Sequence, residues 1–116
     1  MTSATDFYES WPGRMQAVKA LSPDLGRAFV PFFRELMKDG AISSRNKELI
    51  ALGIGIAVRC EACIHTHVEK CLKAGASPAE IMEAAGVAVM MGGGPAYTAT
   101  AVVAAAIDAC QKAAPA

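Results

Sequence analysis

The sequence has little that would attract a nucleic acid or an anionic membrane. Its 11 basic and 11 acidic residues give a formal net charge of zero, and no basic run is longer than an isolated pair. Binding to a polyphosphate or to an anionic lipid surface depends on clustered positive charge. We therefore expect neither of these partners.

Signals for export or for membrane insertion are also missing. The first ten residues have neither a basic start nor an apolar core, so we expect no secretory signal there. Residues 84–107 carry no charge and are formally long enough to cross a bilayer, but the sequence Gly92-Gly93-Gly94-Pro95 interrupts them. This stretch predicts two buried helices joined by a turn. With four cysteines, the chain then fits a reducing, cytoplasmic location.

Size and composition predict one small domain that associates with copies of itself. A chain of 116 residues forms a single domain, 1–116, with room for only a shallow core. Yet 53% of its residues are hydrophobic, which is high for a soluble domain of this size. A homo-oligomer that hides a second apolar face would resolve this conflict.

The periodicity of apolar residues predicts an all-α fold of about five to six helices. Capping serines followed by proline mark helix starts at Ser22-Pro23 and Ser77-Pro78. The apolar run 49–58 could be a buried strand, but no second strand candidate exists to pair with it, so a helix is favoured. We expect residues 1–11 to be a loose arm and residues 44–91 to form the core that carries the main motif.

That motif is Cys60-x-x-Cys63-x-x-x-His67, at the start of a helix predicted over residues 61–74. Positions i, i+3 and i+7 share one face of a helix, so both sulfurs and the His67 ring should lie together. Cysteines in the first turn of a helix meet unpaired N–H groups and the positive end of the dipole, which lowers the pKa of a thiol. This placement favours thiol chemistry.

The residues supply every group that such chemistry requires. His67, one turn after Cys63, can accept the thiol proton, and Cys60 is close enough to form a disulfide with Cys63. Glu48, from the preceding helix, would orient the imidazole if it folds back against it. The candidate catalytic residues are therefore Cys63, Cys60, His67 and Glu48, and we expect no cofactor and no metal.

Other interpretations of these residues stay open. The cysteine pair could be half of a zinc site completed by His67 and by Cys71 or Glu48, although structural zinc sites usually have a second pair elsewhere. The two cysteines could also be apolar residues of a packed interface. Cys71 and Cys110 are expected in the core or an interface, and His65 is expected at the surface.

The spacing Glu48, eleven residues, Cys60-x-x-Cys63-x-x-x-His67 resembles the signature of the carboxymuconolactone decarboxylase superfamily, in its alkylhydroperoxidase D-like branch. The resemblance extends over roughly residues 25–110. It implies trimers or hexamers and thiol-dependent reduction of a small hydroperoxide. Cys63 would attack the peroxide, Cys60 would resolve the product to a disulfide, and a dithiol donor, lipoyl-type or other, would reduce it again.

The chain departs from that branch in two ways. Alkylhydroperoxidase D proteins have a histidine directly before the second cysteine, where this chain has Ala62, and they are longer, with a second helical half. Both departures leave the specific donor and substrate open, but not the thiol mechanism. Two other functions remain as alternatives. One is a lactone decarboxylase or isomerase that uses Glu48 and His67 as acid and base, and the other is a non-enzymatic redox switch.

Overall fold

A computed structural model describes residues 3–113 and contains six α-helices and no strand over that range. In chain order these are α1 (Ala4–Leu21), α2 (Pro23–Met37), α3 (Ser44–Ala57), α4 (Glu61–Lys73), α5 (Pro78–Gly92) and α6 (Gly94–Ala113). The predicted all-α class is confirmed, and the apolar run 49–58 is helical through Ala57, with Val58 as the C-cap residue. Within the described residues, no helix combines the length and hydropathy needed to cross a membrane.

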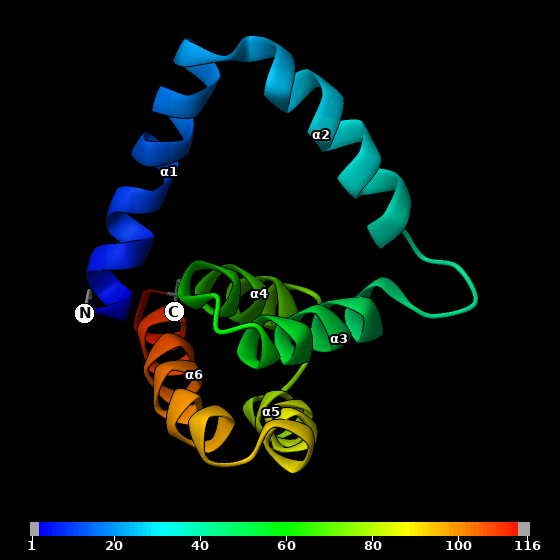
Figure 1. Ribbon diagram of the computed structural model, residues 1–116, viewed down its shortest axis with the longest axis vertical. Coiled ribbons are helices and arrows are strands. Elements are labelled where there is room, and N and C mark those ends of the chain that lie inside the picture. The colour runs from blue at the N-terminus through cyan, green and yellow to red at the C-terminus, as the bar shows by residue number, and fades with distance from the viewer. Residues whose placement is uncertain (1–2, 114–116) are drawn as a thin grey trace.

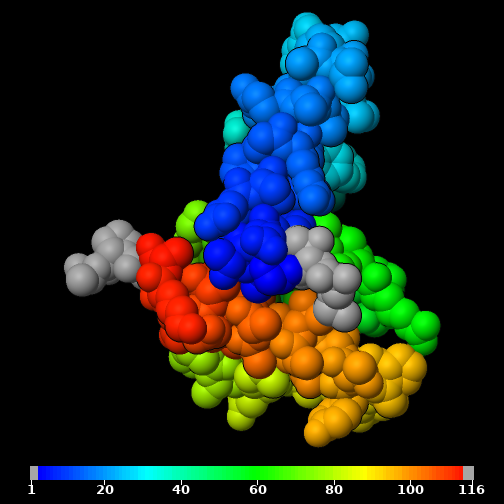
Figure 2. Space-filling view, turned by 90° about the vertical axis from the view of Figure 1, so that its left-hand side faces the viewer, coloured from blue at the N-terminus to red at the C-terminus, as the bar shows by residue number. Residues whose placement is uncertain are grey.

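The helices form a body with an arch attached to it (Figure 1). Helices α3 to α6 pack together as the body, while α1 and α2 rise away from it and meet at Ser22. The space-filling view shows the same division, with the blue and cyan arch standing above the body (Figure 2). The arch is thus joined to the body mainly at its two ends.

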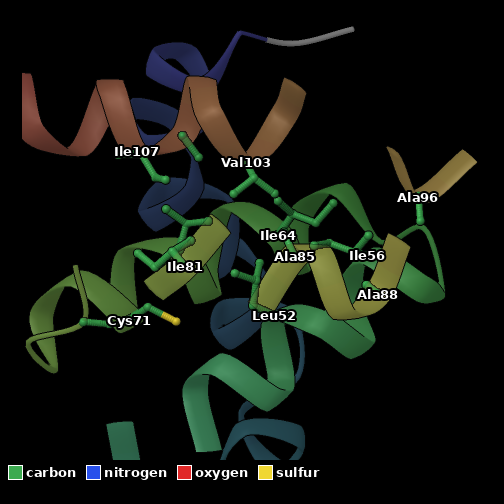
Figure 3. Close-up of a cluster of buried hydrophobic side chains, with 13 residues drawn as sticks. Leu52, Ile56, Ile64, Cys71, Ile81, Ala85, Ala88, Ala96, Val103 and Ile107 are labelled. Carbon is green, nitrogen blue, oxygen red and sulfur yellow. The ribbon is translucent and has the colours of Figure 1, made fainter. Parts of the chain in front are cut away.

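One apolar core holds the body together (Figure 3). Each of the four body helices contributes fully buried side chains, among them Leu52, Val68, Ile81 and Val103. The core therefore extends beyond the predicted range 44–91, because α6 packs against α4 and α5. Small residues such as Ala106 on α6 allow this close packing.

Local capping chemistry sets where the helices begin. Ser77 Oγ accepts the Glu80 N–H at 3.1 Å, and Glu80 Oε1 accepts the Ser77 N–H at 2.9 Å, which is a complete capping box at the start of α5. Ser43 Oγ likewise accepts the Asn46 N–H at 3.1 Å at the start of α3. These bonds satisfy helix N–H groups that otherwise lack partners.

The expectation of a loose arm over residues 1–11 is wrong for the residues the structure describes, and residues 1–2 lie outside them. Helix α1 begins at Ala4, with Ser3 Oγ accepting the Asp6 N–H at 3.1 Å. Phe7 is buried, 5% exposed, and stacks on Trp11 with ring centroids 4.9 Å apart. An i, i+4 aromatic pair stabilises a helix, and here one member also docks onto the body.

His65 is the residue onto which α1 docks, so its expected surface position is also wrong. Its side chain is 1% exposed, and its ring stacks on Phe7 at a centroid distance of 4.4 Å. Its Nδ1 lies 2.9 Å from the Glu61 carbonyl oxygen, and the Tyr8 hydroxyl donates to the His65 carbonyl. The sequence spacing correctly put His65 on a different face of the helix from the cysteines. That face is buried because α1 covers it.

We predict that Phe7→Ala lowers the free energy of unfolding by about 3 kcal/mol, the usual cost of deleting a buried aromatic ring. The loss should be visible in urea denaturation followed by circular dichroism. Leu21→Ala, on the same helix but 88% exposed, is the matched control and should change stability by less than about 0.5 kcal/mol. Equal losses in both variants would contradict the docking role of Phe7.

Helix α2 contains no buried residue, although one face of it is strongly apolar. Its C-terminal end is tied to the body by Lys47, whose Nζ donates to the carbonyls of Leu36 at 3.0 Å and Lys38 at 2.6 Å. The Lys70 ammonium also lies 4.2 Å from the centre of the Phe33 ring. Pro31, which could have split the segment, lies inside one exposed helix, where water can serve the carbonyl it leaves unpaired.

Candidate active site

The two cysteines of the motif meet at the start of α4. Cys60 is the N-cap residue and its Sγ accepts the Cys63 N–H at 3.2 Å. The two sulfurs form a disulfide, with the Cα atoms 5.1 Å apart. The Cys60 sulfur therefore lies at the positive end of the helix dipole. A thiolate formed there after reduction would be stabilised by the same end of the helix.

Helix α3 positions this pair through Gly55. The Gly55 carbonyl accepts the Cys60 N–H at 2.9 Å. A Cβ at position 55 would lie 3.1 Å from the Cβ of Cys63, closer than side chains normally approach. Glycine is thus what allows α3 and the start of α4 to come this close.

Glu48 and His67 also lie together, within a single chain. Glu48 Oε1 is 2.7 Å from His67 Nδ1, and the Glu48 side chain is buried at 7% exposed. A carboxylate only accepts hydrogen bonds, so Nδ1 carries the proton of this bond. In the neutral ring the other nitrogen, Nε2, then carries the free lone pair and is the atom able to take a proton.

The two halves of the site are adjacent on α4. Cys63 and His67 are separated by one helical turn, which places their Cβ atoms about 6 Å apart. The structure thus brings together all four candidate residues, Glu48 from α3 and the other three from the start and first two turns of α4. A thiol, a second thiol, an imidazole and an orienting carboxylate are the components of an activated nucleophile.

The remaining cysteines lie apart from this chemistry. Cys71 is fully buried in the core, and burial, together with the nearby Glu48 charge, raises its pKa to about 12. Burial also raises the pKa of Cys110, which lies beside Tyr8. Both thiols stay protonated at neutral pH, as expected of packing residues.

A cavity lies away from the cysteine pair, against the C-terminal half of α4. It has a volume of about 600 Å³ and lies between α1, α4 and α6, with Tyr8, Leu72 and Cys110 in its wall. None of the four candidate residues lines it. Burial raises the pKa of Tyr8, so the hydroxyl here stays neutral like the thiol. We therefore take the disulfide, and not this cavity, as the candidate active site, because the thiol pair and the imidazole are there.

Residues 3–113 contain no group of three His, Cys, Asp or Glu side chains arranged to hold a metal ion. The zinc interpretation required His67 together with both sulfurs and a fourth ligand. In the structure the sulfurs are bonded to each other, and His67 Nδ1 is engaged by Glu48. In this state the sulfurs and the imidazole are engaged with protein partners.

Sequence reasoning missed two residues that shape the site. Gly55 lies in the Gly53-Ile54-Gly55 run, where a glycine inside a helix is a signal of close packing. Arg59, directly before Cys60, has a backbone φ of 58°. No sequence signal identifies such a conformation at an arginine, because residues with a Cβ rarely adopt it.

Comparisons with known proteins identify the family and agree with the fold. The sequence profile of the carboxymuconolactone decarboxylase family matches residues 23–108. A carboxymuconolactone decarboxylase family protein from Legionella pneumophila has a similar crystal structure, with a TM-score of 0.83 and 29% identity over 94% of this chain and 95% of that one. A family protein from Thermotoga maritima, for which a part in the antioxidative response has been suggested, has a TM-score of 0.69 and 26% identity over 74% and 89% of the two chains.

Two further proteins have similar sequences. Uncharacterized protein 4 in the cox locus of Paracoccus denitrificans is 39% identical over 70 residues, which is 60% of this chain. The match spans 63% of that protein, which is less than two thirds of its length. An uncharacterized protein of Cupriavidus necator is 28% identical over 79 residues, 68% of this chain and 70% of its own length. Since the family profile covers most of the chain and the fold agrees, the chain belongs to the carboxymuconolactone decarboxylase family, and its cysteine pair and His67 fit the alkylhydroperoxidase D-like branch.

Proposed function

We propose that the protein is a thiol-dependent hydroperoxide reductase that works through the Cys60–Cys63 pair. The observation that carries this proposal is a disulfide at the start of α4, one turn before an imidazole that a buried carboxylate holds at 2.7 Å. An antioxidative role suggested for the Thermotoga relative points in the same direction. The reducing cytoplasm is the compartment where such a pair would cycle.

In the reduced protein, His67 takes the proton of the Cys63 thiol through Nε2, directly or through a water. The thiolate attacks the terminal oxygen of the hydroperoxide, the O–O bond breaks, and the alkoxide leaves as an alcohol with the proton from His67. Cys63 is then a sulfenic acid. Glu48 stabilises the imidazolium between these two transfers.

Cys60 completes the cycle. Its thiolate attacks the Cys63 sulfur, the S–O bond breaks, and water leaves as the disulfide forms. A dithiol donor then reduces the disulfide and becomes oxidised itself, so one hydroperoxide and one dithiol give one alcohol, one water and one donor disulfide. The disulfide state of the structure is the oxidised resting point of this cycle.

The test is steady-state consumption of a small hydroperoxide by the reduced protein with a dithiol donor in excess. Continuous turnover supports the reductase. A single stoichiometric oxidation that then stops would favour the redox switch. Turnover of a lactone by the double variant Cys60→Ser/Cys63→Ser would favour the decarboxylase, since the Glu48–His67 pair alone could act as its acid and base.

We also propose that the protein works as a homo-oligomer. The resemblance to the alkylhydroperoxidase D-like branch implies a trimer or a hexamer. The support is the outer stripe of α2, which we define as Leu25, Phe29, Phe32 and Leu36, each more than half exposed. Their 4-3-4 spacing puts them on one face of the helix. A stripe of this kind on a helix without buried residues is a surface for helix–helix association.

Introducing charge into this outer stripe should dissociate the oligomer. We expect Phe29→Asp/Phe32→Asp to raise the dissociation constant at least about a hundredfold, because association would bury two unpaired carboxylates per chain. Light scattering coupled to size-exclusion chromatography would measure the mass. Arg27→Ala, on the opposite face of α2, is the control and should keep the wild-type mass. A wild-type mass for the double aspartate variant would contradict this use of α2.

A further inference from the structure

Arg59 has a backbone conformation that its side chain disfavours. Its φ of 58° lies in the left-handed region, and within residues 3–113 it is the sole non-glycine residue there. Glycine would adopt this conformation without a steric penalty. The turn between α3 and α4 therefore uses a residue that is unfavourable for its backbone, and strain of this kind tends to occur at functional sites.

The position of Arg59 puts its positive charge next to the redox pair. It directly precedes Cys60, so the two Cα atoms are about 3.8 Å apart, and its side chain is exposed. Among the described residues no carboxylate forms an ion pair with it. The guanidinium therefore has no carboxylate partner to neutralise it, and the residue next to the redox pair carries it. Because the screening length is about 8 Å at physiological salt, its field at the sulfurs is stronger at low salt.

Other charges near the turn also affect the electrostatic potential around Cys60 and Cys63. Glu61, two residues later, is an exposed carboxylate in the first turn of α4 and opposes the effect of Arg59. The start of α4 adds partial positive charge, while the end of α3 adds partial negative charge. A purely structural use of Arg59 would be to compensate the end of α3, and this would affect stability rather than reactivity.

We propose that Arg59 is a specificity-determining residue of the redox centre that favours a reactant carrying a carboxylate. The proposal rests on the proposed function, in which a hydroperoxide and a dithiol donor both approach Cys60 and Cys63. Either could carry the carboxylate, as in a fatty-acid hydroperoxide or in dihydrolipoate. The shared chemistry is an anionic group within reach of the guanidinium while sulfur reacts.

A first experiment measures this field without any need for peroxidase activity. The reduced protein is alkylated with iodoacetate, which is anionic, and with iodoacetamide, which is neutral and of similar size. Mass spectrometry of the peptide that carries Cys60 and Cys63 gives the ratio of the two rates. Arg59→Gln should lower the iodoacetate to iodoacetamide ratio about threefold to tenfold at low salt, the scale expected for removing one unit charge from a neighbouring residue at the surface.

Two variants test whether the effect follows the sign of the charge and whether a positive charge at position 59 is sufficient. Glu61→Gln removes a charge of the opposite sign and should raise the same ratio, while Arg59→Lys should keep it near the wild-type value. High salt should reduce all of these differences. An unchanged ratio in Arg59→Gln overturns the proposal, and a lowered melting temperature in that variant with the ratio unchanged assigns Arg59 to the structural use.

A second experiment identifies which reactant carries the carboxylate. Turnover is compared for dihydrolipoate against dihydrolipoamide, and for linoleate hydroperoxide against tert-butyl hydroperoxide. Arg59→Gln should lower kcat/KM threefold to tenfold for the anionic member of one pair and leave its neutral member unchanged. Equal effects on both members of each pair would overturn the proposal. Absence of turnover with every combination refutes the reductase, while the alkylation ratio still decides the role of Arg59.

Discussion

Replacing Cys63 with serine is expected to lower the rate of peroxide consumption at least about a thousandfold, the scale of loss when a nucleophile is removed. A serine hydroxyl is essentially un-ionised at neutral pH and is not activated by a neighbouring imidazole for attack on an O–O bond. The geometry around position 63 should survive, because the N–H that donates to Cys60 Sγ belongs to the backbone. The measurement is steady-state turnover with a dithiol donor in excess.

The partner variant separates the two sulfurs. Cys60→Ser should still consume one equivalent of peroxide and then stop, with a sulfenic acid at Cys63 that dimedone can trap. Cys110→Ser is the matched control. That thiol is on α6 in the wall of the cavity, and burial raises its pKa. This variant should keep wild-type turnover. A sulfenic acid at Cys60 in the Cys63→Ser protein, with no peroxide consumed by Cys60→Ser, would reverse the proposed roles.

The parts of the fold that could be predicted from the sequence depend on interactions within a few residues. Ser77 and Pro78 mark the start of α5 because the capping box needs only Ser77 and Glu80. The site follows the same logic, since Cys60, Cys63 and His67 belong to one helix and its N-cap. Local spacing determines their shared face whatever surrounds it.

What could not be predicted depends on contacts between distant parts of the chain. His65 is buried because Phe7 and Tyr8 return to cover it, 57 residues away in the case of Tyr8. No periodicity within residues 1–11 carries that information. Glu48 reaches His67 because α3 and α4 approach closely at Gly55, and the distance between two helices is a property of packing rather than of either sequence alone.

Glu48→Gln is the second variant with a large expected effect, a fall in kcat/KM of about ten- to a hundredfold, which is part of what general acid–base catalysis contributes. Glutamine has nearly the shape of glutamate, and its amide oxygen can still accept the proton of His67 Nδ1, so the ring should keep its orientation. What is lost is the negative charge 2.7 Å from the ring, which stabilises the imidazolium formed when Cys63 gives up its proton. Rates should be measured with saturating donor over a series of hydroperoxide concentrations.

Two further readouts distinguish this electrostatic role from a folding defect. Glu83→Gln, an exposed carboxylate on α5, is the control for removing one negative charge and should keep wild-type kcat/KM. Removing the Glu48 charge should also lower the pKa of Cys71, which that charge helps to raise, although burial is the larger cause and keeps the thiol protonated at neutral pH. A Glu48→Gln protein with wild-type kcat/KM would show that His67 acts without its carboxylate. A slowed variant that melts like the wild type would place the loss in the chemistry rather than in folding, because the Glu48 carboxylate hydrogen-bonds the His67 imidazole.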